Sequence, residues 1–310
     1  MTASSIPGPA GPAGSGPFDS TAQLMDRITA QLTSQLSRVT PRGRPRPSPA
    51  APRAREAPPA LVAVAHGSRD PAALRTVTAL LARVRALRPG LPVHLGHIEL
   101  NAPLLGDTLA GLTGEAVLVP LLLAPGYHVK HDIPAAAAAA PHLRLRIAAP
   151  LGPHPLLADA LYERLAEAGW DGAARAGAGV VLAAAGSRDP DSAAGTARTA
   201  ALLSTRLGGV PVLPGYASAT GPGAPSVAEA VRALADQGRR RIAVARCFTA
   251  PGLFAGRCAA AAPGPVSAPL GDHPALARLI LHRYEQALGS APVPHASSTP
   301  VSYPAVTVGV

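Results

Sequence analysis

Short apolar runs alternate with amphipathic stretches between residues 60 and 290. Four apolar runs predict strands at Leu61–Ala65, Val93–Ile98, Ala116–Leu121 and Leu143–Ala148. Between and after them, apolar residues at helical spacing predict helices at about 72–88, 102–113, 132–140 and 155–168. Strands that alternate with helices in this way are typical of a parallel sheet with helices on both faces.

The same order of elements then occurs a second time. Strands are predicted at Val180–Ala184, Val210–Tyr216, Arg241–Ala245 and Val266–Ala268, and helices near 191–207, 225–237, 252–262 and 274–288. The word GSRDP recurs at 67–71 and 186–190, and APLGPHP at 149–155 has its counterpart in APLGDHP at 268–274. A repeat of this length indicates a duplicated domain rather than a solenoid. The expected fold class is therefore α/β, with two tandem doubly wound domains that each hold a four-stranded parallel sheet flanked by helices.

The two domains are expected at residues 59–172 and 173–289. The segments before and after them, 1–58 and 290–310, are predicted to be disordered. The first is rich in Pro, Gly and Arg, a composition that buries too little apolar surface to offset the entropy cost of ordering. Within stretch 20–39, the apolar residues recur every four positions and predict one helical stripe, Leu24, Ile28, Leu32 and Leu36. This stripe has two open interpretations, a transient or docked helix without function and a partner-binding helix.

Composition narrows the class of protein. Hydrophobic residues make up 47% of the chain and aromatic residues 3%, so the core must consist of Ala, Val and Leu. The net charge is +10, but Lys130 is the single lysine and seven of the 27 arginines lie in the N-terminal tail. We attribute this skew to nucleotide composition and expect no nucleic-acid partner. Cys247 and Cys258 are expected to be ordinary thiols in a reducing compartment. Without an apolar stretch of about 18–20 residues or a secretory signal, we expect a cytoplasmic protein with no membrane partner.

The repeated word GSRDP is interpreted as scaffold. Asp70 and Asp189 are placed to cap a helix, each followed by a proline at the first helical position. Gly67 and Gly186 allow a sharp turn from strand to helix. Both copies keep these residues, so they build the turn that any such unit needs.

The two copies differ at three potential metal ligands. His66, Glu99 and His128 of the first copy correspond to Ala185, Ser218 and Phe254 of the second. Each of the three lies at or just past the end of a predicted strand, where ligands bind in open α/β sheets. Two imidazoles and a carboxylate suit a divalent metal such as Fe, Co, Ni or Zn, with positions left open for a substrate.

Four words resemble the class II sirohydrochlorin chelatases of the CbiX/SirB type. They are VAHGSRDP (64–71), HIELNAPLL (97–105), VPLLLAPGYHVKHDIP (119–134) and APLGPHP (149–155). The resemblance covers about residues 60–290 as two tandem chelatase-like halves. It implies a lyase of the metal chelatase type that inserts Fe²⁺ or Co²⁺ into sirohydrochlorin without ATP or an organic cofactor, in sirohaem or cobalamin biosynthesis. His66 and His128 match the family's two metal-site histidines, and Glu99 matches an acidic position near the metal.

The resemblance also implies roles for other residues. Sirohydrochlorin carries several carboxylates, so Arg69 and Arg188 are candidates to bind them, although Arg69 has an alternative interpretation as exposed scaffold. His131 is interpreted either as a supporting group or extra ligand of the metal, or as a solvent-facing residue. The second half would form one wall of the cleft. We expect a monomer, and we favour iron slightly over cobalt as the metal.

Two other functions compete with the chelatase. A non-catalytic metal carrier or sensor would use the same histidines but would need no cleft of macrocycle size. A histidine phosphatase is disfavoured because Ala65 stands where an arginine would hold phosphate. The sequence contains no G-x-x-x-x-G-K-[ST] loop, which argues against ATP-driven chemistry.

Overall fold

The computed structural model describes residues 25–26, 28–32, 58–171, 176–218, 224–260 and 263–293, without the side chains of 259 and 260. Contacts separate residues 1–56 from a compact unit that begins at Ala57, and the elements below belong to that unit. Of the stretch 20–39, residues 25–26 and 28–32 are helical and exposed. Leu24 and Leu36 lie outside the described residues, as do most positions for which we predicted disorder.

The first sheet has four parallel strands in the order β2-β1-β3-β4. They are β1 (Ala60–Ala65), β2 (Val93–His97), β3 (Gly114–Pro120) and β4 (Leu143–Ile147). The elements that follow these strands are α2 (Pro71–Leu87), α3 (Leu105–Ala110), the π-helix η1 (His128–Asp132) with α4 (Ile133–Ala138), and α5 (Pro155–Glu167). The register pairs Ala65 with His97 and Val64 with Pro120, so β1, β2 and β3 end together.

The second sheet has three parallel strands in the order β6-β5-β7. They are β5 (Ala178–Ala184), β6 (Val212–Tyr216) and β7 (Arg241–Arg246). The helices of this half are α6 (Pro190–Arg206), α7 (Val227–Asp236), α8 (Leu253–Ala260) and α9 (Pro274–Leu288). The α/β class and its two parallel sheets are thus confirmed.

The prediction of a fourth strand in the second sheet, at 266–268, is wrong. Val266 forms only an isolated bridge with Val244. Pro265 and Pro269 flank this short segment and lack the N–H groups that a ladder requires. Ser267 substitutes for part of the ladder through its side chain, because its Oγ accepts a hydrogen bond from the backbone N–H of Arg246 at 2.9 Å.

The repeated GSRDP word has the scaffold role expected from the sequence. The Asp70 side chain accepts a hydrogen bond from the N–H of Ala72 at 2.8 Å, and Asp189 accepts one from Asp191 at 3.0 Å. Gly67 and Gly186 have φ angles of 106° and 92°, in the region that favours glycine. A Cβ on either one would overlap a backbone carbonyl of the next loop, so each turn requires glycine.

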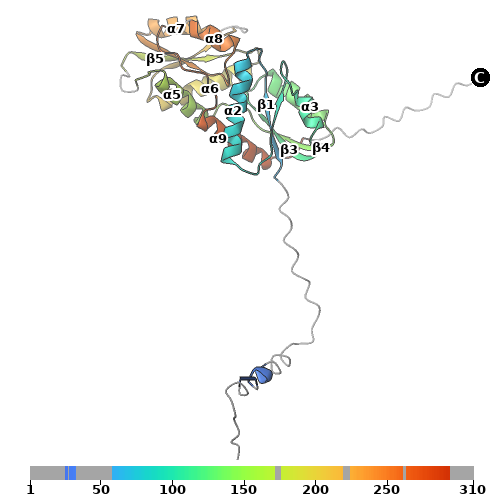
Figure 1. Ribbon diagram of the computed structural model, residues 1–310. Helices are drawn as coiled ribbons and strands as arrows, with labels where there is room; N and C mark the ends of the chain where they lie inside the picture. The colour runs from blue at the N-terminus through green and yellow to red at the C-terminus, as the bar shows by residue number, and fades with distance from the viewer. Residues whose placement is uncertain are drawn as a thin grey trace, which may run out of the picture. The chain divides into compact units, whose positions relative to one another are not determined.

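The last helix of each half packs on the sheet of the other half. Helix α5 follows β4 along the chain but contacts α6 and β7, whereas α9 contacts α2, β3 and β4 (Figure 1). Helices α5 and α9 also contact one another. The boundary expected near residue 172 divides the two sequence repeats, and the packing of these helices runs across it.

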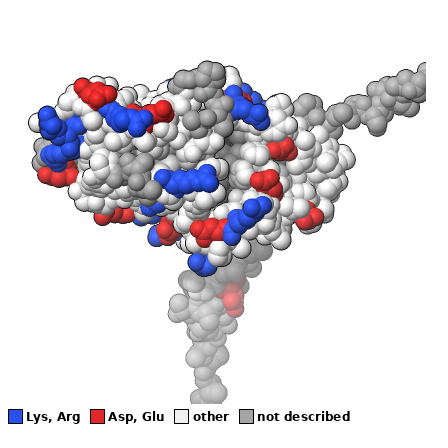
Figure 2. Space-filling view, turned by 90° about the horizontal axis from the view of Figure 1, so that it is seen from above, with Lys and Arg blue, Asp and Glu red and all other residues white. Residues whose placement is uncertain are grey.

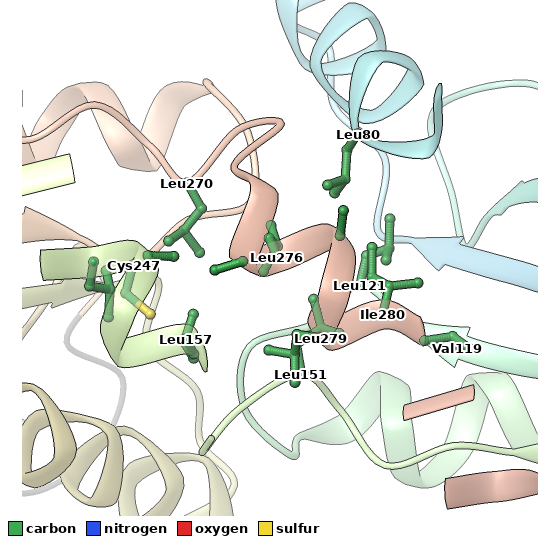
Figure 3. Close-up of a cluster of buried hydrophobic side chains, with 14 of the residues drawn as sticks. Leu80, Val119, Leu121, Leu151, Leu157, Cys247, Leu270, Leu276, Leu279 and Ile280 are labelled. Carbon is green, nitrogen blue, oxygen red and sulfur yellow. The ribbon is translucent and has the colours of Figure 1, made fainter. Parts of the chain in front are cut away.

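One hydrophobic core therefore extends through both halves. It joins the inner faces of the two sheets through the leucines of α5 and α9, as Figure 3 shows for Leu157, Leu276 and Leu279. Smaller clusters lie on the outer faces, under α3 and α4 in the first half and under α7 and α8 in the second. Ala, Val and Leu dominate all three clusters, as composition required. Burial raises the pKa of the free thiols Cys247 and Cys258 to about 12 and about 11, so neither is reactive.

Helices α5 and α9, here called the exchanged helices because each packs on the sheet of the other half, both begin at a histidine cap. The Nδ1 of His154 accepts a hydrogen bond from the N–H of Leu156 at 3.1 Å, and that of His273 accepts one from Ala275 at 3.2 Å. Burial, with the positive charges of Arg283 and His282, lowers the pKa of His154 below 6.5. Burial also lowers the pKa of His273, although the nearby Glu163 carboxylate acts in the opposite sense.

We expect the free energy of unfolding to fall as the pH drops from 7.5 to 5.5. Both imidazoles have a lower pKa in the folded chain than in the unfolded chain. The unfolded state therefore takes up protons first as the pH falls through 6.5, and the stabilisation present above that pH is lost. Urea unfolding at several pH values measures how steeply the free energy of unfolding depends on pH. His154→Asn keeps a capping acceptor that does not titrate, so its slope should be shallower; an equal or steeper slope would contradict the assignment.

Candidate functional site

The carboxyl ends of β1, β2 and β3 bring three predicted ligands together. His66 follows β1 directly, Glu99 lies just past β2, and His128 begins η1. The Nδ1 atom of His66 lies 3.5 Å from Oε1 of Glu99. The rings of His66 and His128 meet edge to face with their centroids 4.6 Å apart. All three side chains line one cleft.

Asp132 orients the imidazole of His128. The turn of η1 is wider than an α-helical turn, and the N–H of Ile133 donates to the carbonyl of His128. Oδ2 of Asp132 lies 2.5 Å from Nδ1 of His128. Because a carboxylate accepts hydrogen bonds, Nδ1 carries the proton, and Nε2 keeps its lone pair for a metal. Asp132 precedes α4 but makes no side-chain capping bond there.

The candidate ligands do not form a closed metal site among the described residues. In the part of the chain that the structure describes, no group of three or more His, Cys, Asp or Glu side chains is placed to hold a metal ion. His66 and His128 form a pair of imidazoles, with Glu99 beside His66. A metal bound by such a pair would keep positions open for ligands from another molecule.

The cleft has walls from both halves and a volume of about 900 Å³. That volume lies in the range of small-molecule sites. The loops of the two halves approach one another in the same way twice. A Cβ built on Gly252 would lie 3.6 Å from Oγ of Ser68, and one on Gly126 would lie 3.7 Å from Oγ of Ser187. The loop after β1 therefore faces the loop after β7, and the loop after β5 faces the loop after β3.

The second half repeats the backbone of the site without its ligands. The N–H of Glu99 donates to the carbonyl of His66 at 3.1 Å, and the N–H of Ser218 donates to that of Ala185 at 3.0 Å. These matching bonds confirm that Ala185 stands in the place of His66 and Ser218 in the place of Glu99. Phe254, which corresponds to His128, also lines the cleft.

The two candidate arginines lie at different places around the site. Arg69 is exposed and lines the cleft, whereas Arg188 lines a neighbouring pocket of about 650 Å³. Neither guanidinium is paired with a carboxylate of a described residue. His131 also lines the neighbouring pocket, with its ring 4.5 Å from that of Tyr127. The structure therefore separates His131 from the cleft that holds His66 and His128.

Lys130 connects the two halves beside the cleft. Its Nζ atom lies 2.8 Å from a carboxylate oxygen of Asp189 and 2.8 Å from one of Asp191. These hydrogen bonds raise the pKa of Lys130, and the bond to Lys130 lowers the pKa of Asp189. Over the wider surface, Lys and Arg alternate with Asp and Glu on the face seen in Figure 2. No helix among the described residues is both long and apolar enough to cross a membrane.

Two further polar residues of the cleft, His97 and Asn101, were not predicted from the sequence. His97 is buried at the end of β2, and its Nδ1 lies 3.2 Å from the carbonyl oxygen of Pro103. Its side chain shares the inner face of β2 with Val93, so the alternation of the strand is a signal that could have found it. Asn101 fixes the loop after β1, because its Oδ1 accepts a hydrogen bond from the N–H of Ser68 at 2.6 Å.

Replacing Asp132 by asparagine should weaken metal binding by about tenfold to a hundredfold. The amide keeps the size of the carboxylate but loses the charge that holds the proton on Nδ1 of His128. Calorimetric titration with Co²⁺ measures the change. Asp107→Asn, which alters a carboxylate in the first turn of α3, is the matched control. An unchanged affinity in Asp132→Asn would show that Asp132 does not support the metal site.

Comparison with known proteins identifies relatives of both halves. The CbiX family model matches residues 60–168 and again 179–287. The sirohydrochlorin cobaltochelatase of Methanococcoides burtonii is 30% identical over 123 residues, which cover 34% of this chain and 94% of the relative. The sirohydrochlorin ferrochelatase of Bacillus subtilis is 32% identical over 173 residues, covering 53% of this chain and 64% of the relative. The first of these relatives therefore corresponds in length to one repeat.

Solved structures share the fold. SirB from Bacillus subtilis with Fe³⁺ superposes with a TM-score of 0.59 at 25% identity, covering 74% of this chain and 95% of that chain. SirB from Bacillus subtilis subspecies spizizenii in complex with cobalt gives a TM-score of 0.59 at 22% identity, covering 76% of this chain and 99% of that chain. The second likeness bears on the fold alone.

Proposed function

The chain belongs to the CbiX family, and from this premise we propose that it is a sirohydrochlorin chelatase, which inserts Fe²⁺ or Co²⁺ into sirohydrochlorin without ATP. The observation that carries the proposal is the pair His66 and His128, which meet in a cleft of about 900 Å³ with metal positions left open. The names of the relatives, sirohydrochlorin cobaltochelatase and sirohydrochlorin ferrochelatase, support this substrate.

In this proposal the metal is a substrate that passes from the imidazoles to the macrocycle. His66 and His128 bind it first, with Glu99 as the candidate third ligand beside His66. Nitrogen atoms of the macrocycle then replace the protein ligands. The macrocycle releases two N–H protons as the metal enters, and a neutral imidazole is a suitable acceptor near pH 7.

Two arginines would position the substrate. The carboxylates of sirohydrochlorin are matched by guanidinium groups, and Arg69 and Arg188 are exposed at the cleft and at the neighbouring pocket without a carboxylate partner among the described residues. The second half supplies a wall of the cleft rather than a second metal site, because Ala185 and Phe254 cannot ligate a metal.

The proposal extends to the setting of the reaction. Both walls of the cleft come from one chain, so we propose a monomer. The two free thiols are compatible with a reducing compartment, and we propose that the enzyme acts in the cytoplasm. Its product would lead to sirohaem if the metal is iron and to a cobalamin if it is cobalt. We favour iron slightly, and propose that no organic cofactor takes part.

An anaerobic assay tests the function. Purified protein is mixed with sirohydrochlorin and Fe²⁺ or Co²⁺ in the absence of ATP, and the absorption spectrum of the macrocycle is followed against a reaction without protein. We expect insertion faster than the spontaneous rate with at least one metal. Ala185→His should leave this activity in place. Tight metal binding without acceleration would instead favour a metal carrier or sensor, which needs the histidines but not the cleft.

A further inference from the structure

The wall of the cleft opposite the imidazoles carries an apolar pair, Leu253 and Phe254. They occupy the positions after the word APG that hold Tyr127 and His128 in the first half. Both line the cleft, and Leu253 is 67% exposed and Phe254 41% exposed. Two large apolar side chains are therefore exposed side by side within the cleft.

The packing of α8 supports this view. The helix is attached to the second sheet through Ala255 and Cys258, which are buried. Phe254 takes no part in the hydrophobic cluster on that side of the sheet, whereas Phe248 does. The chain has three phenylalanines in all, and Phe248 and Phe254 both line the cleft. In a sequence so poor in aromatic residues, an exposed phenylalanine in the cleft is a candidate contact for a bound molecule.

The loops place this pair in the same cleft as His66 and His128, on the wall that the second half provides. Gly252 precedes Leu253 and lies against Ser68, in the loop that begins at His66. One side of the cleft therefore offers imidazoles and a carboxylate, and the facing side offers an aliphatic and an aromatic side chain. Ala185 and Ala250 extend the uncharged side.

A planar conjugated macrocycle fits between two such unlike walls. Its rings stack favourably on an aromatic side chain, and its other face must stay open to the incoming metal. We propose that Leu253 and Phe254 form a platform that binds the macrocycle on the face opposite His66 and His128, so that the metal enters from one face only. This inference rests on the proposed function. It assigns to the second half a part in substrate binding, although this half lacks the candidate metal ligands.

Equilibrium titration with sirohydrochlorin tests the platform. Phe254→Ala should raise the Kd for the macrocycle about tenfold, the effect expected for losing most of one buried aromatic contact. Phe254→Tyr keeps the ring and should bind within about threefold of the unsubstituted protein. Leu253→Ala should also weaken binding, whereas Leu87→Ala, at a leucine that is 51% exposed outside the cleft, should not.

Two further measurements separate binding from a general structural effect. Co²⁺ titration without the macrocycle should give the same affinity in Phe254→Ala as in the unsubstituted protein. In the insertion assay KM should rise by about the same factor as Kd, with a smaller change in kcat, as expected when uniform binding is lost.

The outcomes distinguish the platform from the proposed function. If the unsubstituted protein catalyses insertion and Phe254→Ala binds sirohydrochlorin equally well, the platform is overturned and the chelatase stands. Equal losses of Co²⁺ and macrocycle binding in both Phe254→Ala and Phe254→Tyr would also overturn it. If Phe254→Ala weakens macrocycle binding but no variant or parent accelerates insertion, the platform is supported and the chelatase fails.

Discussion

Replacing His128 by alanine should slow metal insertion by about two orders of magnitude or more. His128 has its Nδ1 held by Asp132 and its ring against that of His66. Its removal takes away both a candidate ligand and a candidate proton acceptor. Initial rates of the spectral change, measured at saturating metal and macrocycle, give the effect. His66→Ala should behave in the same way, and the double variant should lose little more than either single one, because the two imidazoles act on one metal.

The control is a histidine away from the cleft. Nε2 of His142 lies 3.3 Å from the carbonyl oxygen of Leu109 in α3, and His142 does not line the cleft. His142→Ala should therefore keep the parent rate. If His128→Ala and His66→Ala insert metal at that rate too, the site lies elsewhere. If instead they lose insertion but bind Co²⁺ as tightly as the parent, the imidazoles serve proton transfer rather than metal binding.

Leu276→Ala should lower the free energy of unfolding by about 2–5 kcal/mol. Leu276 is fully buried on α9, in the core that joins the two sheets (Figure 3). Truncation leaves a cavity at the junction, where close packing on several sides leaves little room for collapse. Urea unfolding followed by circular dichroism measures the loss.

The exposed Arg278 on the same helix supplies the control. Arg278→Ala should change stability by less than about 0.5 kcal/mol. Because one core spans both halves, the parent and both variants should unfold in a single transition. Two separate transitions, or a loss below about 1 kcal/mol in Leu276→Ala, would show that the halves are stabilised independently.

Most strands, most helices and the grouping of the three candidate ligands in one cleft could be predicted from the sequence. Strands buried on both faces appear as short apolar runs such as Leu61–Ala65. Parallel order then places their carboxyl ends along one edge, where His66, Glu99 and His128 meet. The duplication was the most useful signal for the candidate site. The candidate ligands are absent from the second copy, whereas scaffold residues such as Asp70 are kept in both copies. The fourth strand predicted at 266–268 is absent. The prediction relied on the apolar residues of this segment and neglected the prolines on either side of it.

The exchange of α5 and α9 could not be predicted. Leu157, Leu161 and Leu165 form an apolar stripe that demands a buried face, but the stripe does not specify which of two similar sheets it covers. The support of His128 by Asp132 was missed for a related reason. It depends on the turn of η1, and the sequence gives no periodic signal for a π-helix of five residues.

The exchanged helices also bear on how such a chain can change over generations. A duplicate that lacks the candidate ligands is ordinarily free to be deleted. Here a deletion of the second repeat would remove α9, which packs on α2, β3 and β4 of the first half. The second half can therefore differ at the candidate ligand positions, as at Ala185, and still contribute a helix to the packing of the first half. The positions that correspond to the candidate site can then take other side chains, while the core of the second half stays packed against the first half.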